Sequence, residues 1–255
     1  MDCQEFIDTV VVDGLVFTMD THFVRIHLSR PHQANALNGI MLDNLITFLE
    51  CFHRKPCRQL VMITGSGSSL CAGLDIKYLL HTKNVEDHVY EVSIKVGQLC
   101  DLLWRLPAHV FVAATGHVMG GGCGILACAD TVWASSHIKI ACPEYKLGLL
   151  PIQIAPYLRE KIGSREMALF FDVATFYPIE KFVDNRLVDR IDPDLDSHWQ
   201  LFLTHYNKHT LSAKIKMKQL MHTSLVTSQW REESARAFSQ SWYSALEAGL
   251  LAKYH

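Results

Sequence analysis

The chain of 255 residues carries 24 Lys and Arg against 26 Asp and Glu, so its net charge of -2 does not indicate a nucleic-acid partner. About half of the residues are apolar (49%), as in ordinary globular proteins, and the longest apolar runs are far too short to span a bilayer. The N-terminus has no basic segment, and Asp8 and Asp13 interrupt its apolar stretch, so no signal peptide is expected. We therefore expect a cytoplasmic protein that does not enter the membrane.

The first third of the chain is predicted to contain strands and one long helix. Apolar residues at 24, 26 and 28 alternate with polar ones at 25, 27 and 29, which is the period of two that is typical of a strand with one buried face. Leu15–Met19 resembles a preceding strand. Asn38 is a suitable N-cap for a helix that continues to about Phe52. Leu60–Thr64 is apolar throughout, which indicates a strand buried on both faces.

The middle of the chain continues this alternation. A helix is predicted over Val85–Leu106, followed by a buried strand at Val110–Thr115 and short strands at Thr131–Ser135 and Ile138–Cys142. Strands that alternate with helices predict an α/β fold with a mainly parallel sheet. Eight cysteines are scattered along the chain without a C-x-x-C pair, so we predict reduced, structural cysteines and no metal site.

The C-terminal quarter shows helical patterns only. They cover Trp199–Tyr206, Ser212–Met221 and Gln229–Leu251. We therefore expect a core at residues 1–193 and a helical segment at 194–255.

Two glycine-rich segments carry the chemistry. The first is Leu70–Ile76, which reads Leu-Cys-Ala-Gly-Leu-Asp-Ile, and the second is Gly116–Gly124, which contains Gly120-Gly121-Gly122-Cys123. Glycines between a strand and a helix let the backbone approach a ligand, and a helix N-terminus favours negative charge. The second segment lacks the Gly-Lys-Ser/Thr of a phosphate-binding loop and the acidic residue of a dinucleotide site.

Together these segments resemble the enoyl-CoA hydratase/isomerase (crotonase) family. The resemblance extends over about residues 10 to 190, and its motifs are Arg30-Pro31, Asn35-Ala36-Leu37, Cys71–Asp75, Gly120–Cys123, Ala127–Asp130, Pro143-Glu144, Gly148, Pro151 and Ile162-Gly163. It implies a spiral of ββα units, no cofactor beyond the carrier of the substrate, and a homotrimer or a dimer of trimers. A stripe on the last helix, with Phe238 and Trp242, is expected to pack on a neighbouring subunit.

The resemblance also implies an acyl-thioester site. The backbone N–H groups of Ala72 and Gly121 would form an oxyanion hole, and two such donors stabilise the charge of an enolate. Leu74, Gly120 and Lys77 are expected to contact the substrate. Asp75 is open to two interpretations, because it can face the acyl group or cap the following helix, and the capping role is favoured.

The carboxylates depart from the pattern of the family hydratases. These enzymes carry one Glu directly after the Gly-Gly-Gly-Cys segment and a second in the Pro-Glu motif. This chain keeps the second as Glu144 but has Gly124 at the first position. Glu144 is therefore the candidate acid/base, Gly124 is expected to border the substrate, and we expect Gly124→Glu to restore a second carboxylate.

One carboxylate suffices for dehydration of a 3-hydroxyacyl thioester and for migration of a double bond. A looser resemblance to the dehydratases of polyketide β-branching, carried by the segments at 120–125 and 144–158, favours dehydration of a hydroxymethylglutaryl group. A Δ3,Δ2-enoyl-CoA isomerase is the alternative, and a non-catalytic binding protein of the same fold is a third. The carrier stays open between coenzyme A and an acyl carrier protein, either of which could use Arg25, Arg30, Lys77 and Lys83.

Overall fold

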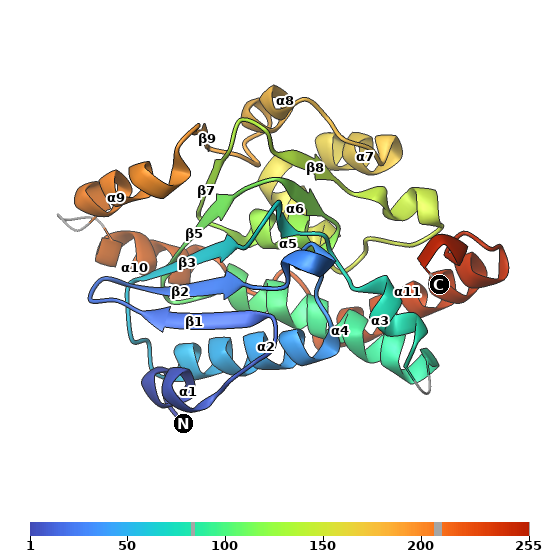
Figure 1. Ribbon diagram of the computed structural model, residues 1–255, viewed down its shortest axis with the longest axis horizontal. Helices are drawn as coiled ribbons and strands as arrows, with labels where there is room; N and C mark the ends of the chain where they lie inside the picture. Colours follow the sequence, from blue (N-terminus) through green and yellow to red (C-terminus); the bar gives the residue numbers. More distant parts are fainter. Residues whose placement is uncertain (83–84, 207–210, 255) are drawn as a thin grey trace.

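A computed structural model of the protein describes residues 1–82, 85–206 and 211–254. Its strands form two sheets (Figure 1). The large sheet has the order β1-β2-β3-β5-β7-β9, and the small sheet has the order β4-β6-β8. The strands are β1 (Leu15–Met19), β2 (Phe23–Leu28), β3 (Leu60–Gly65), β4 (Ser69–Cys71), β5 (His109–Ala114), β6 (His117–Met119), β7 (Thr131–Ala134), β8 (Lys139–Ala141) and β9 (Arg190–Ile191).

The helices lie between and around these strands. They are α1 (Cys3–Thr9), η1 (Pro31–Gln33), α2 (Gly39–Arg54), α3 (Ile76–Leu80), α4 (Val85–Trp104), α5 (Gly121–Cys128), η2 (Pro143–Leu147), α6 (Ala155–Ile162), α7 (Ser164–Val173), α8 (Ile179–Asp184), α9 (Leu195–Tyr206), α10 (Leu211–Met221), α11 (Ser228–Glu247) and η3 (Ala252–Tyr254). None of the described helices is long and apolar enough to cross a bilayer.

The predicted ββα spiral is confirmed by the strand pairing. In each turn one strand joins the large sheet and the next joins the small sheet, as for β3 and β4, β5 and β6, and β7 and β8. A helical segment then leads to the next turn. Among the described strand pairs, β1 and β2 are antiparallel, while the others are parallel. The short strands β4 and β6 lie within the glycine-rich segments, where the sequence pattern did not reveal them.

Alternating side chains of the large sheet pack into two cores. Val61 and Ile63 of β3 join the main core with α2 and α4, which lie along one face of the sheet. Leu60 and Met62 point to the other face, where α9 covers them with Phe202. The prediction that this strand is buried on both faces is therefore confirmed.

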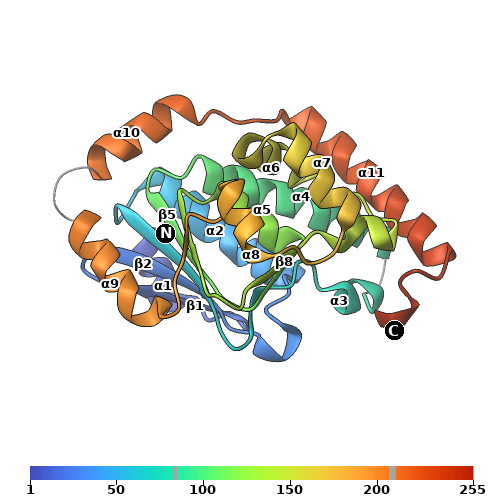
Figure 2. The same cartoon turned by 90° about the horizontal axis from the view of Figure 1, so that it is seen from above.

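The C-terminal helix α11 packs along α4 of the same chain (Figure 2). Its apolar stripe is buried there, since Ala235 and Trp242 are 0% exposed and Ala245 is 1% exposed. This stripe is not free to pack on a neighbouring subunit, so that argument for a trimer was wrong. The oligomeric state and the boundary at residue 193 remain predictions.

The turn at Ala34 and Asn35, between β2 and α2, is hydrogen-bonded to the chain around β4 and the first glycine segment. Ala34 and Asn35 both have positive φ, and Asn35 is completely buried. The Asn35 side chain accepts a hydrogen bond from the N–H of Arg30 at 2.7 Å and donates to the carbonyls of Ser66 at 2.9 Å and Ser69 at 2.7 Å. These bonds fix the turn against the chain that enters β4.

We expect Asn35→Ala to lower the free energy of unfolding by about 2–4 kcal/mol. The change leaves two carbonyls and one N–H without their partner and places alanine at a left-handed φ that Asn tolerates better. Denaturant unfolding measures the effect. Asn44→Ala on the exposed face of α2 is the matched control and should change stability by less than about 0.5 kcal/mol. A similar small loss for both variants would contradict the anchoring role of Asn35.

Candidate active site

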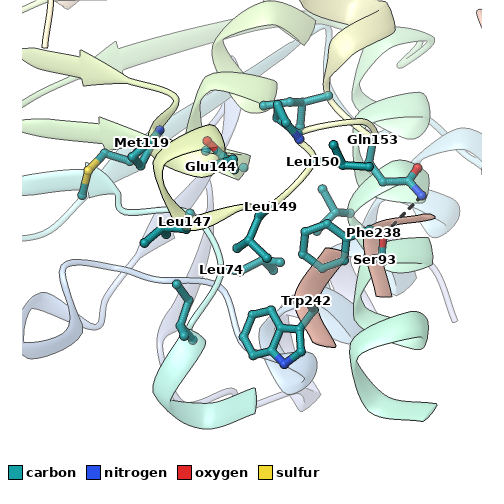
Figure 3. Close-up of a pocket in the computed structure, with 18 of the residues that line it drawn as sticks. Leu74, Ser93, Met119, Glu144, Leu147, Leu149, Leu150, Gln153, Phe238 and Trp242 are labelled. Atoms are coloured by element: carbon teal, nitrogen blue, oxygen red, sulfur yellow. Dashed lines mark hydrogen bonds between the residues drawn. The ribbon is translucent and has the colours of Figure 1, made fainter. Parts of the chain in front are cut away.

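The two glycine-rich segments and the Pro-Glu motif meet around one cavity of about 120 Å³ (Figure 3). Its walls are largely apolar, and Glu144 supplies their only carboxylate in the part of the chain that the structure describes. The lining residues are Ala72, Gly73, Leu74, Ile76, Ser93, Val96, Met119, Gly120, Gly121, Pro143, Glu144, Leu147, Leu149, Leu150, Pro151, Gln153, Ile154, Phe238, Trp242 and Tyr254.

The two glycine segments touch through their backbones. A Cβ added to Gly73 would lie 2.9 Å from the carbonyl oxygen of Met119 and 3.4 Å from the nitrogen of Gly121. Gly73 also has a φ of +87°, which L side chains rarely adopt. Glycine at 73 is therefore required both for the local conformation and for the close approach of the second segment.

The backbone N–H group of Ala72 is already used within the protein. The N–H of Ala72 donates to the carbonyl of Ala34 at 3.0 Å, so it is not free, contrary to the expectation from the sequence. Within the described residues, the N–H groups of Leu74 and Gly121 have no assigned acceptor. Both residues line the cavity, and Gly121 is the first residue of α5, where N–H groups lack partners within the helix.

Glu144 lies in η2 with its carboxyl group against the second glycine segment. A Cβ on Gly120 would collide with Oε1 of Glu144, so this glycine makes room for the carboxyl group. Oε2 is buried and has no hydrogen-bond partner among the described residues. Burial in these surroundings raises the pKa of Glu144 from 4.5 to about 7. The group can therefore take up and release a proton near neutral pH.

Gly124 does not border the cavity and has no room for a larger side chain. A Cβ at this position would lie 2.6 Å from Cγ2 of Ile154 and 3.0 Å from Sγ of Cys100. The expectation that Gly124→Glu would restore a second carboxylate is therefore wrong. Ile154, which does line the cavity, fills this space with an apolar side chain.

The remaining predicted residues that the structure describes lie outside the lining. Asp75 caps α3, because its Oδ1 accepts from the N–H of Tyr78 at 3.0 Å, and its Oδ2 pairs with Arg30 at 2.9 Å. The favoured capping interpretation is therefore confirmed. Lys77 is exposed on α3, and Arg25 stacks on Trp199 of α9 at 5.6 Å. Lys83 lies outside the described residues.

Several lining residues were not named as site candidates in the sequence, although the helix at 85–106 was expected to line the acyl pocket. Ser93 and Val96 lie one helical turn apart on α4, and Phe238 and Trp242 lie one turn apart on α11. The apolar periodicity of Val96, Phe238 and Trp242 was visible, but it predicts only burial and not the partner against which a helix packs. Ser93 is polar and lies outside that pattern. Gln153 and Tyr254 had no recognisable signal.

Two sheets wound as a ββα spiral, with glycine segments meeting a buried glutamate, define a crotonase-like fold. A sequence profile described as enoyl-CoA hydratase/isomerase matches residues 19–248. The chain therefore belongs to the enoyl-CoA hydratase/isomerase family, which confirms the resemblance seen in its motifs.

Individual relatives agree with this assignment. The chain is 28% identical over 141 residues to the crotonyl-CoA hydratase of Syntrophomonas wolfei, a match covering 54% of this chain and 53% of that protein. Its matches thus span about half the length of the curated relatives. An enoyl-CoA hydratase/isomerase from Mycobacterium paratuberculosis superposes with a TM-score of 0.81 at 18% identity, covering 92% of this chain and 98% of the other. An enoyl-CoA hydratase from Bacillus halodurans superposes with a TM-score of 0.81 at 15% sequence identity, covering 94% of this chain and 99% of the other. At such low identities, the two solved structures support the fold alone.

We expect Gly124→Ala to lower the free energy of unfolding by about 1–3 kcal/mol, because the added methyl overlaps Ile154. The same substitution in an Ile154→Ala background should cost less, since the methyl then enters vacated space. Denaturant unfolding of the four proteins in this double-mutant cycle measures the coupling. Equal costs in both backgrounds would show that Ile154 does not fill the space beside Gly124.

We expect Glu144→Gln to change the pH dependence of stability. The pKa of Glu144 is raised on folding, so the unfolded chain binds fewer protons than the native protein between about pH 4.5 and 7, and stability falls as pH rises through this window. The glutamine variant lacks this fall. The difference in the free energy of unfolding between variant and wild type should therefore shift in favour of the variant by about 1–3 kcal/mol between pH 4.5 and pH 7. Unfolding across this pH range tests it, with Glu160→Gln on the exposed side of α6 as a control that should follow the wild-type profile. Parallel profiles for wild type and Glu144→Gln would exclude a raised pKa.

Proposed function

We propose that this protein binds an acyl thioester and forms its enolate, with Glu144 as the only carboxylate that moves protons. The observation that carries the proposal is the unpaired Oε2 of Glu144 in an apolar cavity beside the two glycine segments. Such surroundings keep the pKa of the carboxyl group near neutral pH, and they offer no other hydrogen-bond donor to Oε2 among the described residues. The relatives named as hydratases act on thioesters of the same kind.

We assign the oxyanion hole to the N–H groups of Leu74 and Gly121. Both line the cavity and both lack an acceptor among the described residues, whereas the N–H of Ala72 is already bonded. The thioester oxygen gains negative charge when the α-proton leaves. Two fixed donors stabilise this charge without a proton transfer, and one such donor contributes about 3–4 kcal/mol in comparable sites.

The first candidate reaction is dehydration of a 3-hydroxyacyl thioester, together with its reverse. The carboxylate of Glu144 takes the α-proton, and the electron pair of the C–H bond moves onto the thioester oxygen. When the enolate collapses, a carbon–carbon double bond forms and the bond between C3 and its hydroxyl breaks. The hydroxyl leaves as water with the proton from Glu144, which returns to the carboxylate form.

The second candidate reaction is migration of a double bond between the 3 and 2 positions. It is favoured by Ile154 and Cys100, which occupy the space next to Gly124 and leave no second carboxylate to orient water. In this reaction Glu144 would carry one proton between the α- and γ-carbons. Both reactions pass through the same enolate, so the substrate and not the oxyanion hole separates them.

The carrier is proposed to be coenzyme A or the phosphopantetheine arm of an acyl carrier protein. The lining contains no Lys or Arg within the described residues, so it offers no cation for a second carboxylate of a hydroxymethylglutaryl group. We therefore do not extend the proposal to polyketide β-branching. A panel of 3-hydroxyacyl and 3-enoyl thioesters on both carriers, followed by mass spectrometry and deuterium exchange at the α-carbon, tests the reaction class. Absence of exchange on every thioester would exclude enolate formation and favour a binding protein.

We expect Glu144→Gln to reduce kcat by a factor of about 10²–10⁴ while thioester affinity changes little, because the amide cannot accept the α-proton. Single-turnover kinetics and equilibrium binding measure the two effects separately. Wild-type kcat/KM should rise with pH through about 7, as the base form of Glu144 becomes populated. Lost affinity with unchanged turnover would assign Glu144 a role in binding and not in proton transfer.

A further inference from the structure

The far wall of the cavity carries a buried polar pair that the proposed chemistry does not use. Ser93 of α4 and Gln153, which precedes α6, are 2% and 5% exposed, and both line the cavity. Figure 3 places them on the side opposite Glu144, with Leu149, Leu150 and Phe238 nearby. Polar groups at this depth usually have all their hydrogen bonds satisfied, so any that remain unused need an explanation.

The amide of Gln153 is oriented by its partners. Its Nε2 donates to the carbonyl of Arg231 at 3.1 Å and to Oγ of Ser93 at 3.3 Å, which uses both hydrogens. The reversed amide would place its oxygen against the Arg231 carbonyl, where two acceptors repel each other. A Cβ on Gly97 would collide with Oε1 of Gln153, so this glycine makes room for the amide.

This orientation leaves one donor and one acceptor unused. Ser93 accepts from Gln153 and therefore keeps its own O–H, for which no acceptor is assigned among the described residues. Oε1 of Gln153 is buried and has no hydrogen-bond partner within the same part of the chain. An unmet buried polar group costs about 1–3 kcal/mol, which a polar ligand atom can recover.

The charge of the lining restricts what that ligand atom can be. No Lys or Arg lines the cavity in the described chain, and Glu144 already contributes a carboxyl group. A second carboxylate would be buried without a partner, which is costly. A neutral oxygen, in contrast, accepts from the Ser93 O–H without adding charge.

We propose that the acyl group of the substrate carries a neutral oxygen substituent, a hydroxyl or keto group remote from the thioester, and that Ser93, held by Gln153, binds it. The inference rests on the proposed function, since it assumes that the acyl chain enters between Glu144 and this wall. Plain alkyl thioesters then fit the apolar part of the cavity but leave the O–H of Ser93 unpaired.

The test compares pantetheine thioesters, which contain the part common to both carriers. Alkanoyl chains from butanoyl to octanoyl are paired with their ω-hydroxy counterparts, and binding is measured by calorimetry. At one chain length or more, Ser93→Ala should lower the affinity ratio of hydroxylated to plain ligand by about tenfold, the usual effect of one lost hydrogen bond. Ser93→Cys retains the volume but donates weakly, and it should lower the ratio in the same direction.

Val96→Ala, one turn further along α4, is the matched control. It widens the cavity for both ligands and should leave the ratio unchanged. A loss of affinity in Ser93→Ala that is equal for both ligands at every chain length would assign Ser93 a structural role and overturn the inference. Preferential binding of an ω-carboxy ligand by the wild type would overturn it as well.

The same ligands separate this inference from the proposed function. If α-protons exchange but the affinity ratio of hydroxylated to plain ligand does not change in Ser93→Ala, the enolate chemistry stands and the polar subsite is excluded. A ratio that depends on Ser93, without exchange on any thioester, supports the subsite and removes the chemistry.

Discussion

The close approach of two backbone segments determines the rest of the site. Gly73 faces the carbonyl of Met119, and a Cβ on Gly122 would lie 2.5 Å from the carbonyl of Cys71. Each segment thus presents a glycine to the backbone of the other, and any side chain at these positions would separate them. The buried turn at Ala34 and Asn35 holds the first segment in place through the bonds to Ala72, Ser66 and Ser69. Leu74 and Gly121 line the same cavity as a consequence.

This arrangement also sets the electrostatics of Glu144. The carboxyl group lies against Gly120 and has apolar neighbours, so its charged form is disfavoured and its pKa rises to about 7. Ile154 adds an apolar side chain to the lining and fills the space beside Gly124. Burial among apolar groups disfavours the charged form of a carboxyl group, and this is the physical cause of the raised pKa.

The C-terminal helix is part of this cavity. Phe238 and Trp242 line it from α11, and Gln153 joins α11 to α4 through the carbonyl of Arg231 and the hydroxyl of Ser93. In the proposed function, the selection of the acyl group would therefore depend on α11 as well as on the segments that carry the family motifs.

The sequence by itself determined the α/β class, the strands β1, β2, β3, β5, β7 and β8, the helix capped by Asn38 and the family, because these follow from local periodicity, capping and glycine spacing. It also identified Glu144 and Gly121 as site candidates through the motifs that contain them. Only the tertiary structure decided that Ala72 is already bonded, that Gly124 faces Ile154 and that Trp242 is buried within its own chain. These three depend on which distant segments come into contact. A residue's sequence neighbours specify its conformation and its tendency to be buried, but not the atom that it meets.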